Sequence, residues 1–188
     1  MTVVIDGTTG IDTVQDGAIV AADIAAGAVT QTKLASGVAG NGPAFSAYGN
    51  GGVALSTNTA TKIALQNETF DTANCFDNST NYRFTPNVAG YYEINGTIGT
   101  GTASSVGGYM AAVIYKNGST YNVGSYNYTS SSFGMAASVS SLIYLNGSTD
   151  YVELYVYMGN GVTATTSNSF GGTAGAILQF SGSLVRAA

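Results

Sequence analysis

Few residues in this chain could carry out acid–base chemistry. The sequence of 188 residues has no histidine, which removes Ser-His-Asp and Cys-His catalysis and histidine-ligated zinc. A pair of carboxylates could still hydrolyse a glycosidic bond, and the candidates are Asp71, Asp77, Glu93, Asp150 and Glu153. Such a cleft also needs a platform on which the sugar stacks, and the chain has no tryptophan. We expect Glu93 and Glu153 to face solvent from strands. The sequence therefore predicts that the protein is not an enzyme, with a glycan depolymerase as the least favoured function.

No metal, cofactor or nucleic-acid partner is predicted either. Asp71, Asp77 or Asp150 could join asparagine carbonyls around calcium, but no loop has the spacing of an EF-hand. The single cysteine, Cys75, cannot form an intramolecular disulfide, and we expect a small, buried or half-buried side chain. The net charge is −5 and the five basic residues are scattered, so no basic patch can neutralise a phosphate backbone.

One segment has the composition of a binding loop. Residues 121–132 have the sequence YNVGSYNYTSSS. Tyrosine offers contact area at small entropic cost, while serine, glycine and asparagine offer adaptable hydrogen bonds. The alternative is a solvated hairpin that only connects two strands. If the segment binds a receptor, we expect Tyr121, Tyr126 and Tyr128 to contact it, by ring stacking where the receptor is a glycan.

The elements that would position these residues are strands. Only 8% of the residues are charged, and Gly (26) and Tyr (13) are abundant, which favours pleated strands and turns over helices. Alternation and turn signals such as Asn-Gly predict about eight strands, typical of a sandwich or jelly roll. The predicted strands are 44–48, 61–65, 82–85, 90–98, 108–116, 135–145, 151–158 and 176–185.

Residues 1–40 differ from the rest because they contain no aromatic residue and carry a repeat. Gly17–Ala26 aligns with Gly27–Ser36 at a period of ten, and apolar residues recur every five positions. This spacing fits neither a helical face nor an alternating strand, and one chain cannot bury such a row. We therefore predict a stalk in which copies of the chain wind together, the alternative being a flexible Ala/Gly linker. The expected contacts between chains are Ile19, Ile24, Val29 and Leu34.

Several aromatic residues on the predicted strands belong either to the core or to the axis between chains. They are Phe45, Phe84, Tyr92 and Phe180. Phe45 and Phe180 are the two that we expect to take part in the contact between chains.

Short motifs in residues 43–188 carry a family resemblance. In order, they are Pro43-Ala44-Phe45-Ser46-Ala47, Phe84-x5-Gly90-x-Tyr92, Lys116-Asn117-Gly118, Leu145 to Asp150-x-Val152-x-Leu154, and Phe180-Ser181-Gly182-x-Leu184. By these motifs, residues 43–188 resemble the globular head of complement component one, subunit q, and its tumour-necrosis-factor relatives, and we predict that residues 41–188 form the head. The resemblance implies a homotrimeric jelly roll with both chain ends at its base. It also implies that the loops around Pro86, Asn117–Ser132 and Gly159–Gly175 lie at the opposite end.

The repeat Gly27–Ala35 resembles a module that is common in phage tail-fibre proteins. Together the two resemblances favour a virion fibre or fibre tip: residues 1–40 attach to a larger assembly, and the head binds a glycan or protein on the host cell. The alternative is a capsid head fibre or decoration protein that recognises no receptor. The sequence shows neither a signal peptide nor an uninterrupted apolar run of membrane-spanning length. We therefore expect synthesis in the host cytoplasm, a final place on the virion surface and no membrane insertion.

Overall fold

The computed structural model describes residues 42–104, 107–128, 134–170, 173–174 and 176–188, together with Ile24, Val29 and Lys33. The chain divides into two units, Met1–Ala35 and Ser36–Ala188. The predicted boundary between residues 40 and 41 stays a prediction, and the repeats within residues 1–40 lie outside the described residues. The account that follows concerns the second unit, which we call the head.

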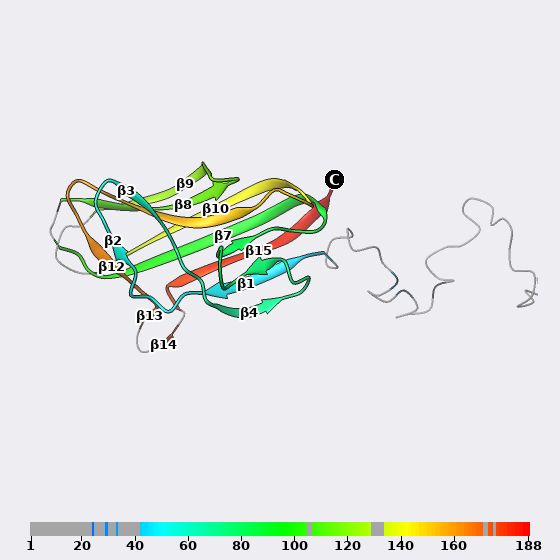
Figure 1. Ribbon diagram of the computed structural model, residues 1–188, viewed down its shortest axis with the longest axis horizontal. Coiled ribbons are helices and arrows are strands. Elements are labelled where there is room, and N and C mark those ends of the chain that lie inside the picture. Colours follow the sequence, from blue (N-terminus) through cyan, green and yellow to red (C-terminus); the bar gives the residue numbers. More distant parts are fainter. Residues whose placement is uncertain are drawn as a thin grey trace, which may run out of the picture. The chain divides into compact units, whose positions relative to one another are not determined.

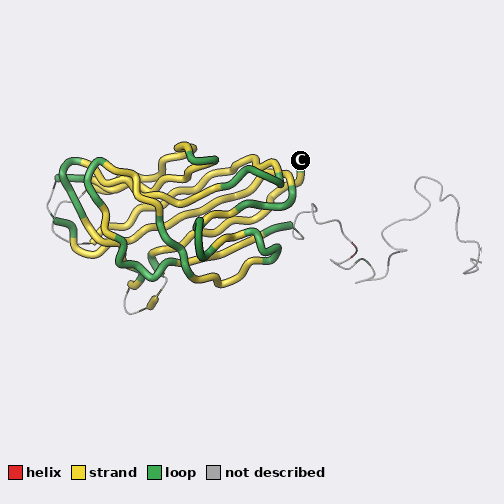
Figure 2. The backbone as a smooth tube through the Cα atoms, in the orientation of Figure 1, coloured by secondary structure: helices red, strands yellow, loops and turns green. Residues whose placement is uncertain are grey.

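Strands joined by loops make up the described part of the head (Figure 2). Two antiparallel sheets lie face to face, and Figure 1 shows their strands. One sheet has seven strands, in the order β2-β12-β7-β15-β1-β4 with β10 added beside β7, and the other has five, in the order β5-β6-β11-β8-β9. The strand bounds are β1 (Ala44–Tyr48), β2 (Ala54–Leu55), β3 (Thr59–Lys62), β4 (Asn67–Asp71), β5 (Phe76–Asp77), β6 (Arg83–Phe84), β7 (Ala89–Thr102), β8 (Tyr109–Lys116), β9 (Ser119–Tyr128), β10 (Gly134–Asn146), β11 (Val152–Gly159), β12 (Ala164–Ser167), β13 (Ser169–Phe170), β14 (Thr173–Ala174) and β15 (Leu178–Ala187).

The pairing of the strands is nested, which defines a jelly roll. β8 pairs with β9, β7 with β10, β6 with β11, and β1 with β15, as in a long hairpin folded over on itself. The predicted all-β jelly roll is therefore confirmed, and each of the eight predicted strands overlaps an observed one. The predicted binding loop is a different matter, because most of it is strand β9. Asn117 and Gly118 have the positive φ angles (52° and 77°) that a tight two-residue hairpin turn requires. The chain therefore reverses within two residues, and β9 begins at Ser119, directly after the turn.

The space between the sheets is filled by apolar side chains that alternate along the strands. On β10 every second residue from Met135 to Val139 is buried, and Ile143 and Leu145 continue the row. Phe45 lies at the centre of an aromatic cluster, with ring centroids 4.9 Å from Phe76, 4.4 Å from Phe84 and 5.2 Å from Phe180.

This core corrects one sequence-based expectation. Phe45 and Phe180 have no exposed surface within a single chain. Neither side chain can therefore contribute surface to a contact between chains. Strand β1 pairs with β15 and turns both rings inward, so they belong to the core, the other role considered for them.

The two ends of the head differ from the expected arrangement of loops. The Asn117 amide donates to the Asp150 carboxylate at 2.8 Å, and the Ala188 N–H donates to the Ala89 carbonyl at 3.1 Å. Because Ala89 also pairs with Asn146, the turns near residues 86, 117 and 147 lie at the same end as the C-terminus. The expectation that Pro86 and Asn117 lie at the opposite end is wrong. The turn at Gly159–Gly161 does lie at that opposite end, as expected, together with the close of β9 at Tyr128, which pairs with Tyr109.

Side chains of β9 join the two sheets along one side of the sandwich. The Asn122 amide donates to the Ser140 carbonyl at 3.0 Å, and the Ser125 hydroxyl donates to the Ser138 carbonyl at 3.3 Å. The Asn127 amide donates in the same way to the Ala136 carbonyl. Strand β9 therefore closes the sandwich against β10 through side chains instead of a backbone ladder. We call this set of hydrogen bonds the β9–β10 seam.

Candidate functional site

The outer face of the five-stranded sheet has an unusual distribution of side-chain sizes. On β8, Met110, Ala112 and Ile114 point into the core, so the residues between them point outward. Two of these outward residues are small, and they are nevertheless almost fully covered: Ala111 is 1% and Val113 is 4% exposed. The larger side chains around these two residues supply the cover.

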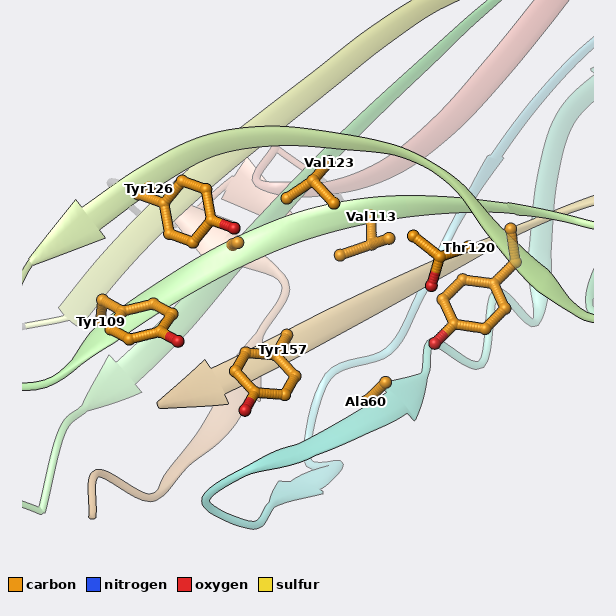
Figure 3. Close-up of a pocket in the computed structure, with 9 residues that line it drawn as sticks. Ala60, Tyr109, Val113, Thr120, Val123, Tyr126 and Tyr157 are labelled. Carbon is orange, nitrogen blue, oxygen red and sulfur yellow. The ribbon is translucent and has the colours of Figure 1, made fainter. Parts of the chain in front are cut away.

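The result is a hollow of about 270 Å³, which we call the tyrosine groove (Figure 3). Its floor is Ala111 and Val113, and its walls come from the strands on either side of β8 and from β3. The lining residues are Ala60, Tyr109, Ala111, Val113, Tyr115, Thr120, Val123, Tyr126 and Tyr157.

Contacts between rings hold the walls in place. Tyr109 lies at the centre of one cluster, with ring centroids 5.4 Å from Tyr126, 5.6 Å from Tyr128 and 6.0 Å from Tyr157. Tyr115 stacks on Tyr155 at 3.9 Å and forms a second station further along β8. Rings packed in this way lose little freedom on binding a ligand, so the groove is largely preorganised.

The groove is electrically neutral. Burial raises the pKa of Tyr109, and the neighbouring Tyr157 adds to this shift. Burial, with the nearby Glu153 carboxylate, raises the pKa of Tyr155 to about 12. Both phenols therefore stay protonated throughout the physiological range, and each keeps a hydroxyl that can donate and accept hydrogen bonds.

An ion pair lies beside the groove. The Lys62 ammonium, on β3, contacts the Glu153 carboxylate at 2.5 Å and also donates to the Asn81 carbonyl at 3.2 Å. Glu153 is only 3% exposed. The expectation that Glu153 faces solvent is wrong, because β3 lies beside this part of β11 and supplies a cation that allows the carboxylate to be buried.

The three tyrosines predicted to bind a receptor are separated by the structure. Tyr126 lines the groove, and Tyr128 contacts it through Tyr109. Tyr121 falls in a register shift of the β8–β9 pairing and is absent from the lining. Residues 129–132 of the predicted loop lie outside the described residues.

Sequence reasoning missed Tyr109, Tyr115 and Tyr157, although a signal for them exists. Tyrosines occur at alternate positions in Tyr155-Val156-Tyr157 and at both ends of Tyr109–Tyr115. Strands whose inward positions are filled by aliphatic residues must turn these rings outward, so two neighbouring strands with this pattern indicate an aromatic surface.

The outer face of the seven-stranded sheet carries a second feature, a row of large exposed side chains that we call the apolar row. Its members are Tyr91 (43% exposed), Leu142 (54%), Tyr144 (41%) and Val185 (48%). Tyr91 pairs with Tyr144 across β7 and β10, and their ring centroids are 5.5 Å apart.

Among the residues predicted to contact other chains from the stalk, Ile24 and Val29 are 46% and 54% exposed, whereas Ile19 and Leu34 lie outside the described residues.

The carboxylates considered for catalysis or calcium are dispersed over separate structural roles. Asp71 accepts from the N–H of Phe76 at 2.7 Å, and Asp77 accepts from the N–H of Thr80 at 2.9 Å. These turn hydrogen bonds lower the pKa of Asp77, and a hydrogen bond from Asn117 lowers that of Asp150. Glu93, which is partly buried, accepts from the Ser140 hydroxyl at 2.6 Å. Within the described residues, no three potential ligands are grouped around a common metal position.

Two further features of the described residues bear on expectations from the sequence. Cys75 is half-buried, as predicted, and burial raises the pKa of its thiol. The described part of the chain also has no helix with the length and apolar character needed to cross a membrane.

Comparison with known proteins reveals similarity at the level of structure alone. No family model and no curated protein matches the sequence. Among solved structures, the globular domain of zebrafish complement 1qA has a TM-score of 0.50 at 14% identity, with 78% of this chain and 99% of that chain covered. Murine APRIL has a TM-score of 0.57 at 10% identity, with 76% and 98% covered. Eiger TNF from S. frugiperda has a TM-score of 0.55 at 12% identity, with 77% and 93% covered. The head therefore has the C1q/TNF-like jelly-roll fold, which confirms the resemblance that its motifs indicated.

Proposed function

We propose that this chain forms a homotrimeric fibre or fibre tip on a bacteriophage virion, and that its head attaches the particle to a host cell through the tyrosine groove. The observation that carries the proposal is the difference between the two outer faces of the head. The seven-stranded sheet presents the protruding apolar row, which suits contact with further copies of the chain. The five-stranded sheet presents a recessed, neutral groove, which suits a ligand.

The trimer is supported by the fold and by the position of the apolar row. Four large side chains, more than two-fifths exposed each, lie on one face of a single chain. Contiguous apolar patches of this kind on soluble proteins mark contacts with a partner, and identical copies with rotational symmetry are the commonest partner. The jelly-roll resemblance implies three copies. In this arrangement the row takes the place between chains that the sequence assigned to Phe45 and Phe180.

The phage assignment rests on the repeat in residues 1–40, which we propose attaches the head to a larger virion assembly. The alternative, a decoration protein on the capsid, needs the apolar row and the N-terminal segment but has no use for the groove. The groove is therefore the feature that favours attachment to a host over decoration.

Two measurements test the proposal. Light scattering on the full chain is expected to give about three times the chain mass of 19.0 kDa, and a monomer would overturn the trimer. The fluorescently labelled trimer is then incubated with host cells. Saturable binding supports attachment, whereas a trimer that labels virions in electron micrographs but binds no cell would move the assignment to decoration.

A further inference from the structure

The chemistry of the groove restricts what it can bind. Its floor consists of the apolar side chains Ala111 and Val113, and its walls are tyrosine rings with hydroxyls at their edges. A ligand that fits must present an apolar face to the floor and rings, and polar groups around its perimeter. Sugar rings have this form, because one face exposes C–H groups that stack on an aromatic ring while the hydroxyls project at the edge.

The charges restrict the ligand further. Apart from the tyrosine phenols, no residue lining the groove has an ionisable side chain. Lys62, on the same strand as the lining residue Ala60, is bound to the Glu153 carboxylate at 2.5 Å and to the Asn81 carbonyl at 3.2 Å. An anionic sugar would lose hydration there without gaining a partner, and the net charge of −5 would repel it. The groove therefore matches an uncharged ligand.

The length of the groove favours a chain over a single ring. Its two aromatic stations are the cluster around Tyr109 and the stacked pair of Tyr115 and Tyr155. Both Tyr109 and Tyr115 lie on β8, six residues apart, which corresponds to roughly 20 Å along a strand. A linear oligosaccharide can contact both stations at once, and the hollow over Ala111 and Val113 lies between them.

A peptide fits this surface less well. The backbone of β8 is paired on both sides, to β11 and to β9, so an extended peptide cannot add to the sheet at the groove.

We propose that the tyrosine groove binds a linear, neutral glycan, with its sugars stacked on Tyr109, Tyr126 and Tyr157 at one end and on Tyr115 at the other. This inference rests on the proposed function, since it names the class of receptor at the same site. Three copies in a trimer would add avidity to sites that are individually weak.

The test begins with an array that carries neutral hexose and N-acetylhexosamine chains beside sialylated, sulfated and uronic-acid chains. The full-length protein is expected to bind neutral chains of several sugars and to ignore the anionic ones. The best neutral oligosaccharide is then titrated calorimetrically into the wild type and four variants. Tyr126→Ala removes a wall, Val113→Phe fills the hollow, Tyr126→Phe keeps the ring, and Tyr121→Ala changes an exposed tyrosine on the same strand outside the groove.

Tyr126→Ala is expected to weaken binding about tenfold, as expected for the loss of one aromatic contact, and Val113→Phe to abolish it. Tyr126→Phe should keep most of the affinity and Tyr121→Ala all of it. Melting temperatures and trimer mass are measured for each variant. If Val113→Phe fails to fold, the contrast between Tyr126→Ala and Tyr121→Ala still decides the question.

Binding of anionic chains alone, or equal affinity of Tyr126→Ala and Tyr121→Ala, would overturn the inference. The proposed function is judged separately by the cell assay. Saturable binding to cells that is unaffected by Tyr126→Ala and by the neutral oligosaccharide would leave attachment in place and reject the glycan site, in favour of a protein receptor elsewhere on the head. Absence of cell binding alongside neutral-glycan binding on the array would keep the site and reject host attachment.

Discussion

The outer faces of the two sheets contain the same residue types but have opposite shapes. Tyrosines and aliphatic residues lie on both. On the seven-stranded sheet, Leu142 and Tyr144 stand out above serines, so the apolar surface protrudes. On the five-stranded sheet, Ala111 and Val113 lie below a rim of tyrosines, so the apolar surface is recessed. The positions of small and large side chains decide whether the face of a sheet projects or is hollow. A projecting apolar face suits contact with a large partner, whereas a hollow suits a ligand.

The largest expected effect comes from placing a charge on the protruding face. Leu142→Asp should convert the proposed trimer into monomers, because three carboxylates would be buried together without partners. Light scattering measures the mass, with Val123→Asp as a matched control: Val123 is 40% exposed, but on the grooved face. A variant Leu142→Asp that stays trimeric, or a Val123→Asp that dissociates, would show that the two faces have been assigned the wrong way round.

A second prediction tests whether both faces rest on one shared core. Phe45→Ala removes the ring that contacts Phe76, Phe84 and Phe180, and it should reduce the free energy of unfolding by about 3–5 kcal/mol. Denaturant unfolding at a fixed protein concentration measures this loss. The mass of the folded fraction should stay trimeric, since Phe45 has no exposed surface. Dissociation without loss of stability would instead return Phe45 to the interface.

A third, smaller effect concerns the single ion pair beside the groove. Lys62→Met leaves the buried Glu153 carboxylate without its cation and should cost about 1–3 kcal/mol, less than for a fully buried pair because Lys62 is partly exposed. The double variant Lys62→Met with Glu153→Gln should recover much of this loss, because no charge then remains buried. Thermal unfolding of both variants measures the difference. Equal stability of the single and double variants would show that solvent reaches Glu153.

The smallest expected effect lies at high pH. The pKa of Tyr155 is raised to about 12, so its neutral form stabilises the folded state fully below the ordinary pKa near 10. This contribution is lost as the pH rises from about 10 toward 12. A phenylalanine at position 155 cannot ionise. The variant Tyr155→Phe should therefore lose less free energy of unfolding than the wild type over this range, with each protein compared with its own value at pH 8. Denaturant unfolding over this pH range measures the loss for both proteins, and an equal loss in the wild type and in Tyr155→Phe would contradict the prediction.

Much of the fold was predictable because it depends on local patterns. Alternation in Tyr151–Tyr157 and turn residues such as Asn146-Gly147 indicate strands and their ends, and eight such strands indicate a sandwich. The short strands β2, β4, β5, β12, β13 and β14 were not predicted, since two to five residues carry little periodic signal. Strand β9 was missed for another reason: its serines, asparagines and glycine have low strand propensity, and it is ordered by the seam with β10.

The candidate site was predicted only in part. The composition of residues 121–132 drew attention to Tyr126 and Tyr128, which do lie at the groove. It gave no means of separating them from Tyr121, because the register shift that displaces Tyr121 depends on the partner strand. Tyr109 and Tyr157 are distant in sequence, and only the pairing of β8 with β11 brings them together. The choice between core and interface for Phe45 likewise depends on which face of β1 meets the second sheet.

The β9–β10 seam has a consequence for how this protein can change over generations. The residues that hold β9 in place, Asn122, Ser125 and Asn127, direct their polar groups at carbonyls of β10. The residues that line the groove from the same strand, Thr120, Val123 and Tyr126, are different ones. Mutations in the second set leave the anchoring hydrogen bonds intact, so the surface of the groove can change without loss of the strand. The residues that hold the strand in the fold and the residues that line the groove can therefore change independently over generations.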